Sequence, residues 1–140
     1  MSEQTIFDKI VAGEIPARTV HETDTTLAFL DANPLAPGHT LVIPKEGYER
    51  VGDLPASLSA DLFGAVHELT PRIEEAVDAD AITIGINDGP AAGQEIPHVH
   101  VHIVPRFDGD GGGPIHGVAG SPPDIADEEL DDIAASIRND

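Results

Sequence analysis

Residues 98–104 read His-Val-His-Val-His-Ile-Val, and this row of histidines is the part of the chain best equipped for chemistry. Side chains alternate between the two faces of a β-strand, so His98, His100 and His102 would share one face, with Cα atoms about 6.5–7 Å apart. Val99, Val101 and Ile103 would pack on the core from the other face. Imidazoles at this spacing can all reach one substrate.

The histidine row is open to three interpretations. It could be a polar sheet face without a function, although His is the side chain that titrates near neutral pH. It could be a metal site, because clustered imidazoles are good zinc ligands. It could also be a catalytic site, in which one neutral imidazole attacks the substrate while its neighbours hold its tautomer and deliver protons.

The loop before the row favours the catalytic interpretation. Asn87–Gln94 reads Asn-Asp-Gly-Pro-Ala-Ala-Gly-Gln. Glycines let backbone N–H groups approach an anion, and Asn or Gln amides can donate to phosphate oxygens, although most such clusters are only turns. Beside a histidine row, this composition fits phosphoryl chemistry better than a structural metal. His39 opens another expected strand and is a candidate fourth imidazole; the alternative is an exposed histidine at a strand end.

The elements that must position these residues can be read from hydrophobic periodicity and turn signals. The long helix contains Pro71, which predicts a kink or two abutting helices. We expect helices over Thr5–Ala12, Ser57–Ala79 and Asp124–Ile137, and strands over Arg18–Glu22, Thr25–Leu30, His39–Pro44, Ala81–Ile86 and His98–Val104.

A run of strands around one long helix predicts an α+β fold with a mainly antiparallel sheet, rather than alternating βαβ units. The length of 140 residues fits a single domain over 1–140, with a Gly-rich and acidic C-terminal extension from about residue 107. We expect no second domain and see no internal repeat.

The charge and composition exclude several classes of protein. Against 26 Asp and Glu there are only 7 Lys and Arg, a net charge of −19, which argues against nucleic-acid binding. The acids are spread along the chain, which favours a surface adapted to a high-salt cytosol over an ordinary acidic protein. With no Cys, the chain has no disulfide, thiolate zinc site or Cys nucleophile. No apolar run reaches about 20 residues and no signal peptide is evident, so we expect a cytoplasmic protein without membrane contact.

The histidine row is similar to the signature of the histidine triad (HIT) family of nucleotide hydrolases and transferases. The resemblance extends from about Thr5 to Arg106 and includes Ile6-Phe7, Gly13–Pro16, Leu27–Asp31, Ala36–Lys45 and Asn87–Gln94. It implies a five-stranded antiparallel sheet with flanking helices, extended across a homodimer. It also implies hydrolysis of a nucleoside phosphoramidate or a dinucleoside polyphosphate, with a purine nucleotide as the expected ligand.

The resemblance also implies roles for single residues. His100 resembles the nucleophile that attacks the α-phosphate and forms a nucleotidyl-histidine, with His98, His102 and His39 as supporting histidines. Glu95 stands where several relatives have Ser or Thr, and a carboxylate is unfavourable beside phosphate. The nucleotide-binding residues implied are Asp31 for the ribose, Asn87, Gly93 and Gln94 for the phosphate, and Ile6, Phe7, Ile10, Ile15 and Phe29 for the base.

We expect this protein to bind no structural or catalytic metal ion. Many prokaryotic relatives bind structural zinc through two Cys and a His together with a triad His, but the matching positions here are Thr5, Asp8 and Gly47. The family chemistry needs no catalytic metal and no other cofactor. Two alternatives remain open: a nucleotide-binding adaptor without significant turnover, and a metal-dependent hydrolase.

Overall fold

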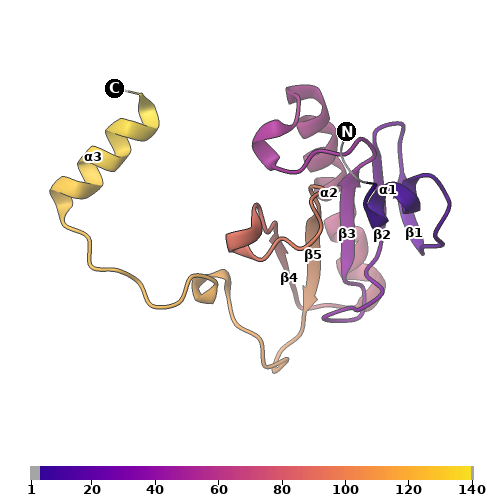
Figure 1. Ribbon diagram of the computed structural model, residues 1–140. Helices are drawn as coiled ribbons and strands as arrows, with labels where there is room; N and C mark the ends of the chain where they lie inside the picture. The colour runs from indigo at the N-terminus through magenta and orange to yellow at the C-terminus, as the bar shows by residue number, and fades with distance from the viewer. Residues whose placement is uncertain (1–3, 140) are drawn as a thin grey trace. The chain divides into compact units, whose positions relative to one another are not determined.

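The computed structural model describes residues 4–139, which form three α-helices, five strands and three short 3₁₀ turns (Figure 1). The chain divides into two compact units, the first ending at Asp110 and the second beginning at Gly111. The elements are α1 (Ile6–Val11), β1 (Thr19–Glu22), β2 (Thr26–Leu30), β3 (Thr40–Pro44), α2 (Ala56–Val77), β4 (Ala81–Gly85), β5 (Val101–Arg106) and α3 (Asp127–Arg138).

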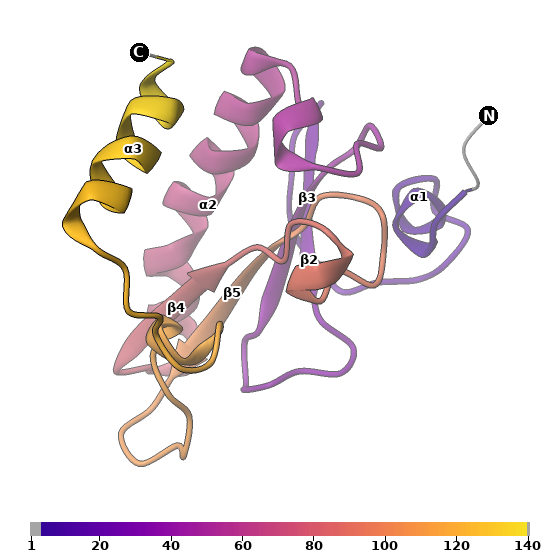
Figure 2. The ribbon, with the colours of Figure 1, turned by 60° about the vertical axis from the view of Figure 1, so that its left-hand side comes forward.

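The five strands form one sheet in the order β1-β2-β3-β5-β4, and every neighbouring pair is antiparallel. Helix α2 lies along one face of this sheet, and α1 lies at the other side (Figure 2). The α+β fold with a five-stranded antiparallel sheet and flanking helices is therefore confirmed. None of the helices within residues 4–139 is long and apolar enough to cross a membrane.

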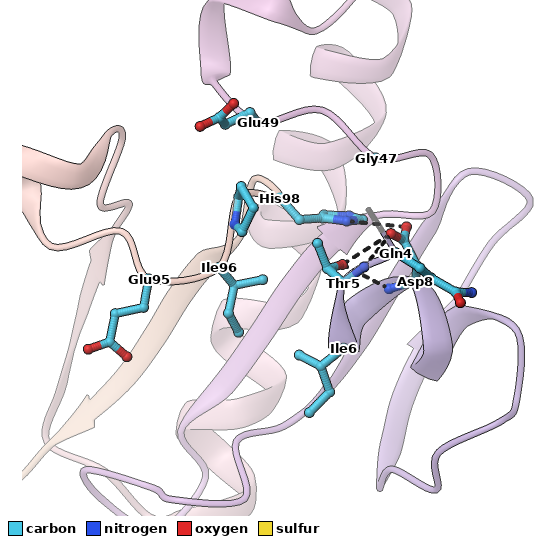
Figure 3. Close-up of a pocket in the computed structure, with 10 residues that line it drawn as sticks. Gln4, Thr5, Ile6, Asp8, Gly47, Glu49, Glu95, Ile96 and His98 are labelled. Atoms are coloured by element: carbon cyan, nitrogen blue, oxygen red, sulfur yellow. Dashed lines mark hydrogen bonds and ion pairs between the residues drawn. The ribbon is translucent and has the colours of Figure 1, made fainter. Parts of the chain in front are cut away.

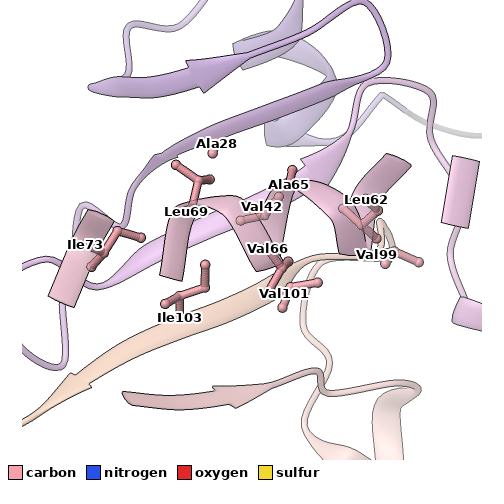
Figure 4. Close-up of a cluster of buried hydrophobic side chains, with 10 residues drawn as sticks. All are labelled: Ala28, Val42, Leu62, Ala65, Val66, Leu69, Ile73, Val99, Val101 and Ile103. Carbon is pink, nitrogen blue, oxygen red and sulfur yellow. The ribbon is translucent and has the colours of Figure 1, made fainter. Parts of the chain in front are cut away.

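Because side chains alternate between the two faces of each strand, the buried apolar residues form two clusters, one on each face of the sheet. In β3, Val42 faces α2, whereas Leu41 and Ile43 face α1. The larger cluster joins the apolar stripe of α2 to one face of the sheet (Figure 4). Its buried members are Ala28, Val42, Leu62, Ala65, Val66, Leu69, Ile73, Val99, Val101 and Ile103. Val99, Val101 and Ile103 thus face the core as expected, which turns the histidines to the opposite face.

Helix α1 covers part of that opposite face although it has only six residues. A capping box stabilises the first turn of α1. The Thr5 hydroxyl accepts a hydrogen bond from the Asp8 N–H, and the Asp8 carboxylate accepts one from the Thr5 N–H. Phe7 anchors the helix in the second cluster, packed with Leu27, Phe29, Leu41 and Ile43. A short helix is marginal by itself, so cap and anchor together hold α1 beside the histidines.

Three expected elements differ from those observed. β5 begins at Val101 rather than His98, because the Val99 N–H donates to the Tyr48 carbonyl at 2.7 Å instead of joining the ladder with β3. Helix α2 is continuous through Pro71, so the expectation of two abutting helices is wrong; Pro71 is exposed, and water can replace the lost backbone bond. α3 begins at Asp127 rather than Asp124, with three acidic residues in its first turn, where the helix dipole favours them.

Candidate active site

A cavity of about 400 Å³ opens beside the histidines, on the face of the sheet that α1 covers. It brings together residues that lie far apart in the sequence. The expected site residues that line it are His100, His102, Asp31, Asn87, Gly93, Ile6, Phe7, Ile10 and Phe29. Four other expected residues, His39, His98, Gln94 and Ile15, are not among its lining.

His100 is held in one orientation and one tautomer. Its Nδ1 lies 2.8 Å from the His98 carbonyl oxygen, and a carbonyl can only accept, so Nδ1 carries the proton. The neutral ring therefore keeps a lone pair on Nε2. Phe7 packs against the ring edge-to-face with centroids 5.0 Å apart, and the side chain is buried. The His98 carbonyl and Phe7 thus fix the orientation of the His100 ring, with Nε2 as the nitrogen that can carry the lone pair.

A chain of hydrogen bonds fixes His102 in the complementary tautomer. The Leu35 N–H donates to His39 Nδ1 at 3.1 Å, so His39 Nε2 carries a proton and donates to His102 Nδ1 at 3.0 Å. His102 consequently keeps its own proton on Nε2. Beside a lone pair on His100, the cavity therefore contains an N–H donor suited to an anionic oxygen.

Burial keeps these supporting histidines neutral. Loss of solvent lowers the pKa of His102 to about 4, helped by the neighbouring His100 and His39 and opposed by the Asp31 carboxylate. Burial likewise lowers the pKa of His39, with Asp31 again opposing. A neutral His39 is required for the hydrogen-bond chain from Leu35, because an imidazolium nitrogen cannot accept.

His98 lines a neighbouring cavity (Figure 3) and is not among the lining residues of the cavity that contains His100 and His102. Its Nε2 donates to the Pro44 carbonyl at 2.8 Å, which draws the ring towards the end of β3. Its Nδ1 is buried without a hydrogen-bond partner, 3.7 Å from Asp8 Oδ1. The contribution of His98 to the active-site cavity is its backbone carbonyl, which orients His100.

The loop before the histidines is held by its own side chains. Gln94 accepts from the Gly89 N–H at 2.8 Å and donates to the carbonyls of Glu49 at 2.8 Å and Ile96 at 3.1 Å. Its amide shapes the loop. A Cβ on Gly89 would lie 3.0 Å from the Arg50 guanidinium carbon, and its φ is +106°, so glycine is needed there.

Asp31 follows β2 directly and is oriented by its own turn. Its Oδ1 accepts from the Asn33 N–H at 2.9 Å, and its backbone N–H donates to the His39 carbonyl at 2.9 Å. Leu41 and Ile96 are further apolar lining residues that we did not expect from the sequence. The alternation in β3 could have identified Leu41, because it shares a face with Ile43 in the cluster around Phe7.

Asp31, His39 and His102 are the residues here that could hold a metal ion, with one ligand atom from each within 4.8 Å of the others. The facing nitrogens of His39 and His102 already share a hydrogen bond, so an ion would have to replace it. The arrangement itself provides an oriented imidazole, an N–H donor, an apolar wall and a carboxylate in one cavity. It is suited to attack on an electrophile that carries anionic oxygens.

Comparison with known proteins finds relatives that match most of the chain. The family model described as "HIT domain" matches residues 12–109. An uncharacterized HIT-like protein of Methanocaldococcus jannaschii is 46% identical over 106 residues, which cover 76% of this chain and 81% of that protein. The solved structure of a histidine triad nucleotide-binding protein from Candida albicans superposes with a TM-score of 0.81 at 29% identity, covering 96% of this chain and 95% of that one.

Several relatives have names that state an activity. A bis(5′-nucleosyl)-tetraphosphatase of Schizosaccharomyces pombe is 42% identical over 79% of this chain, and an adenylylsulfatase of Arabidopsis thaliana is 38% identical over 79%. This chain spans only 59% and 56% of those two proteins. Both names describe hydrolysis of a nucleotide.

Proposed function

This chain belongs to the HIT domain family, and from this we propose that it hydrolyses nucleotides at the α-phosphate through a covalent nucleotidyl-histidine on His100. The observation that carries the proposal is the tautomer of His100. Because Nδ1 donates to the His98 carbonyl, the nitrogen left to attack is Nε2. Named relatives that hydrolyse nucleotides support the same class of reaction.

The reaction has two displacements at phosphorus. The His100 Nε2 lone pair forms a bond to the α-phosphorus, and the leaving group departs with the electrons of its own bond. Water then attacks the phosphohistidine, which releases a nucleoside monophosphate and restores neutral His100. The His102 Nε2–H donates to a phosphate oxygen in both steps, where the negative charge increases.

The nucleoside occupies the rest of the cavity. Ile6, Phe7 and Phe29 provide an apolar wall for a base, and the Asp31 carboxylate accepts from the ribose hydroxyls. None of the described residues that line the cavity is Lys or Arg. The imidazoles, the Asn87 amide and the backbone around Gly93 are therefore the donors available to the phosphate.

The test is replacement of the nucleophile. His100→Ala should lower hydrolysis by roughly three orders of magnitude or more, while nucleotide binding persists, because the covalent route is lost. Turnover of adenosine 5′-phosphoramidate and of diadenosine tetraphosphate is measured with a chelator present. Exposed His67, replaced by Ala, is the matched control.

A label transferred from an α-³²P nucleotide to the wild-type protein but not to the His100→Ala variant would support the covalent step. Near-normal turnover by the variant would refute it. Binding without turnover in the wild type would indicate an adaptor, and turnover abolished by the chelator would indicate a metal-dependent hydrolase.

The chain is also proposed to work as a homodimer whose sheet continues from one copy to the next. β4 is at an edge of the five-stranded sheet, and an edge strand presents unpaired backbone groups to another chain. Ile84 on β4 is 43% exposed, which provides apolar surface at that edge. An isologous pair would join β4 to its symmetry mate.

A further inference from the structure

The cluster of Asp31, His39 and His102 has the spacing of a metal site. His39 Nε2 lies 3.0 Å from His102 Nδ1 and 3.7 Å from Asp31 Oδ2. Ligand atoms that lie about 2.0–2.1 Å from a tetrahedral zinc ion are about 3.3–3.4 Å apart, so the spacing alone would admit Zn²⁺. Both nitrogens would have to offer a lone pair to the ion. Whether the cluster binds a metal therefore depends on where the two rings carry their protons.

One backbone donor decides the position of the His39 proton. The His39 side chain is buried, and the Leu35 N–H donates to its Nδ1 at 3.1 Å. An amide N–H cannot accept, so the proton of the neutral ring is on Nε2, the nitrogen that a metal ion would need. To free Nε2, the proton would have to move to Nδ1 and oppose the Leu35 N–H, which leaves two buried donors facing each other.

The loop around Leu35 holds this donor in place. Before Leu35, the Asn33 N–H donates to Asp31 Oδ1 at 2.9 Å, and after it the His39 N–H donates to the Ala36 carbonyl at 3.1 Å. The Asp31 N–H closes the segment by donating to the His39 carbonyl at 2.9 Å. The Leu35 side chain itself is 77% exposed. The contribution of Leu35 to the buried cluster is therefore its backbone N–H.

We propose that the Leu35 N–H keeps Asp31, His39 and His102 free of divalent metal ions, and that loss of this single donor converts the cluster into a zinc site. Without the donor, the His39 proton moves to Nδ1 and leaves a lone pair on Nε2. Zn²⁺ then binds His39 Nε2, His102 Nδ1 and Asp31 Oδ2. Each ring remains neutral with one proton, so the ion replaces the hydrogen bond between the rings without a net loss of protons.

The same donor sets the direction of the hydrogen bond between His39 and His102. If His39 Nε2 becomes the acceptor, His102 must donate from Nδ1, and a lone pair on its Nε2 then faces the cavity. That lone pair repels a phosphate oxygen instead of donating to it. This consequence rests on the proposed hydrolase function, whereas the metal inference does not. Hydrolysis should fall by about 100-fold, as when one donor to a developing negative charge is lost.

The test replaces one atom group. The α-hydroxy analogue of leucine, inserted at position 35 by nonsense suppression, exchanges the N–H for an ester oxygen and keeps the side chain. Leucine inserted in the same way is the matched control. ¹⁵N NMR of the histidine rings reports which nitrogen carries the proton. We expect His39 and His102 to be protonated on Nε2 in the control and on Nδ1 in the ester chain.

Zinc affinity is measured on both full chains by competition with a chelator of known affinity. The ester chain should bind Zn²⁺ about 10–100-fold more tightly, because binding no longer opposes two buried donors. Asp31→Asn in the ester chain should abolish the gain, since it removes one ligand. Asp24→Asn, an equal charge change at an exposed position, should leave the gain unchanged. Hydrolysis is measured separately, with excess chelator and no added zinc.

Equal zinc affinity and equal ring protonation in the two chains would overturn the inference. A His39 proton on Nδ1 in the wild-type chain would also overturn it, whether or not the ester chain folds. If the ester chain shows the expected protonation and zinc binding but the control does not hydrolyse nucleotides, the proposed function fails and the metal inference stands.

Discussion

Mild acid should destabilise this protein through His102. Its pKa is about 4 in the folded chain, because of burial first and the neighbouring His100 and His39 second, against 6.5 for an ordinary histidine. As the pH falls below 6.5 the unfolded chain takes up a proton that the folded chain does not. The stabilisation is therefore fully present above pH 6.5 and is lost as the pH approaches 4.

The pKa shift sets the size of the effect. Because the unfolded chain binds one proton that the folded chain does not, the free energy of unfolding should fall by about 2 kcal/mol between about pH 7 and about pH 5. By about pH 4 the total fall should be about 3 kcal/mol. Burial also lowers the pKa of His39 and His98, which adds loss in the same direction. The window above about pH 5 avoids most carboxylate protonation.

The assay is urea unfolding followed by circular dichroism at several pH values and one KCl concentration. The His102→Gln variant removes the titrating group, so its free energy of unfolding should fall by about 2 kcal/mol less than that of the wild type over the same range. His67→Gln, exposed on α2, is the matched control and should follow the wild type. If His102→Gln and the wild type lose the same free energy, the pKa of His102 is not lowered by folding and the reasoning is wrong.

Three further predictions concern charge, assembly and packing. The melting temperature should rise from tenths molar to molar KCl, because 26 acidic against 7 basic residues make repulsion dominant; a flat or falling melting temperature, with a neutral osmolyte as control, would contradict this. Sedimentation of the wild type in molar KCl should give a mass of twice the chain mass of 14.7 kDa. The variant Ile84→Lys on β4 should lower the measured mass towards that of a single chain, and a wild-type monomer would refute the sheet-extended dimer. Leu69→Ala should lower the free energy of unfolding by about 2–5 kcal/mol, because Leu69 is buried between α2 and the sheet. The control Leu35→Ala, at an exposed position, should lower it by less than about 0.5 kcal/mol. Equal losses in the two variants would show that packing of α2 on the sheet is not a main source of stability.

Much of the fold could be predicted from the sequence because its signals are local. The alternation in β3 and in residues 98–104 assigns each side chain to a face without reference to any partner. The apolar stripe of α2 predicts a helix that covers one side of the sheet. Element ends were less predictable: β5 begins at Val101 because Val99 bonds to Tyr48, a contact between distant segments.

The candidate site shows the same division. The sequence by itself determined which residue types could act, namely a row of histidines beside a Gly-rich loop. Only the tertiary structure decided what each of them does. His98 and Gln94 match family motifs, yet the His98 ring lies in the neighbouring cavity and the Gln94 amide is engaged within its own loop.

The tautomers depend most strongly on the tertiary structure. A histidine can carry its proton on either nitrogen, and the choice follows from which carbonyl or N–H lies against the ring. For His98 that partner is the Pro44 carbonyl, 54 residues away, and for His102 it is His39, 63 residues away. Hydrogen bonds between segments so distant in sequence have no local signal. The sequence could therefore name the imidazoles, whereas folding decided which nitrogen of each ring carries the proton.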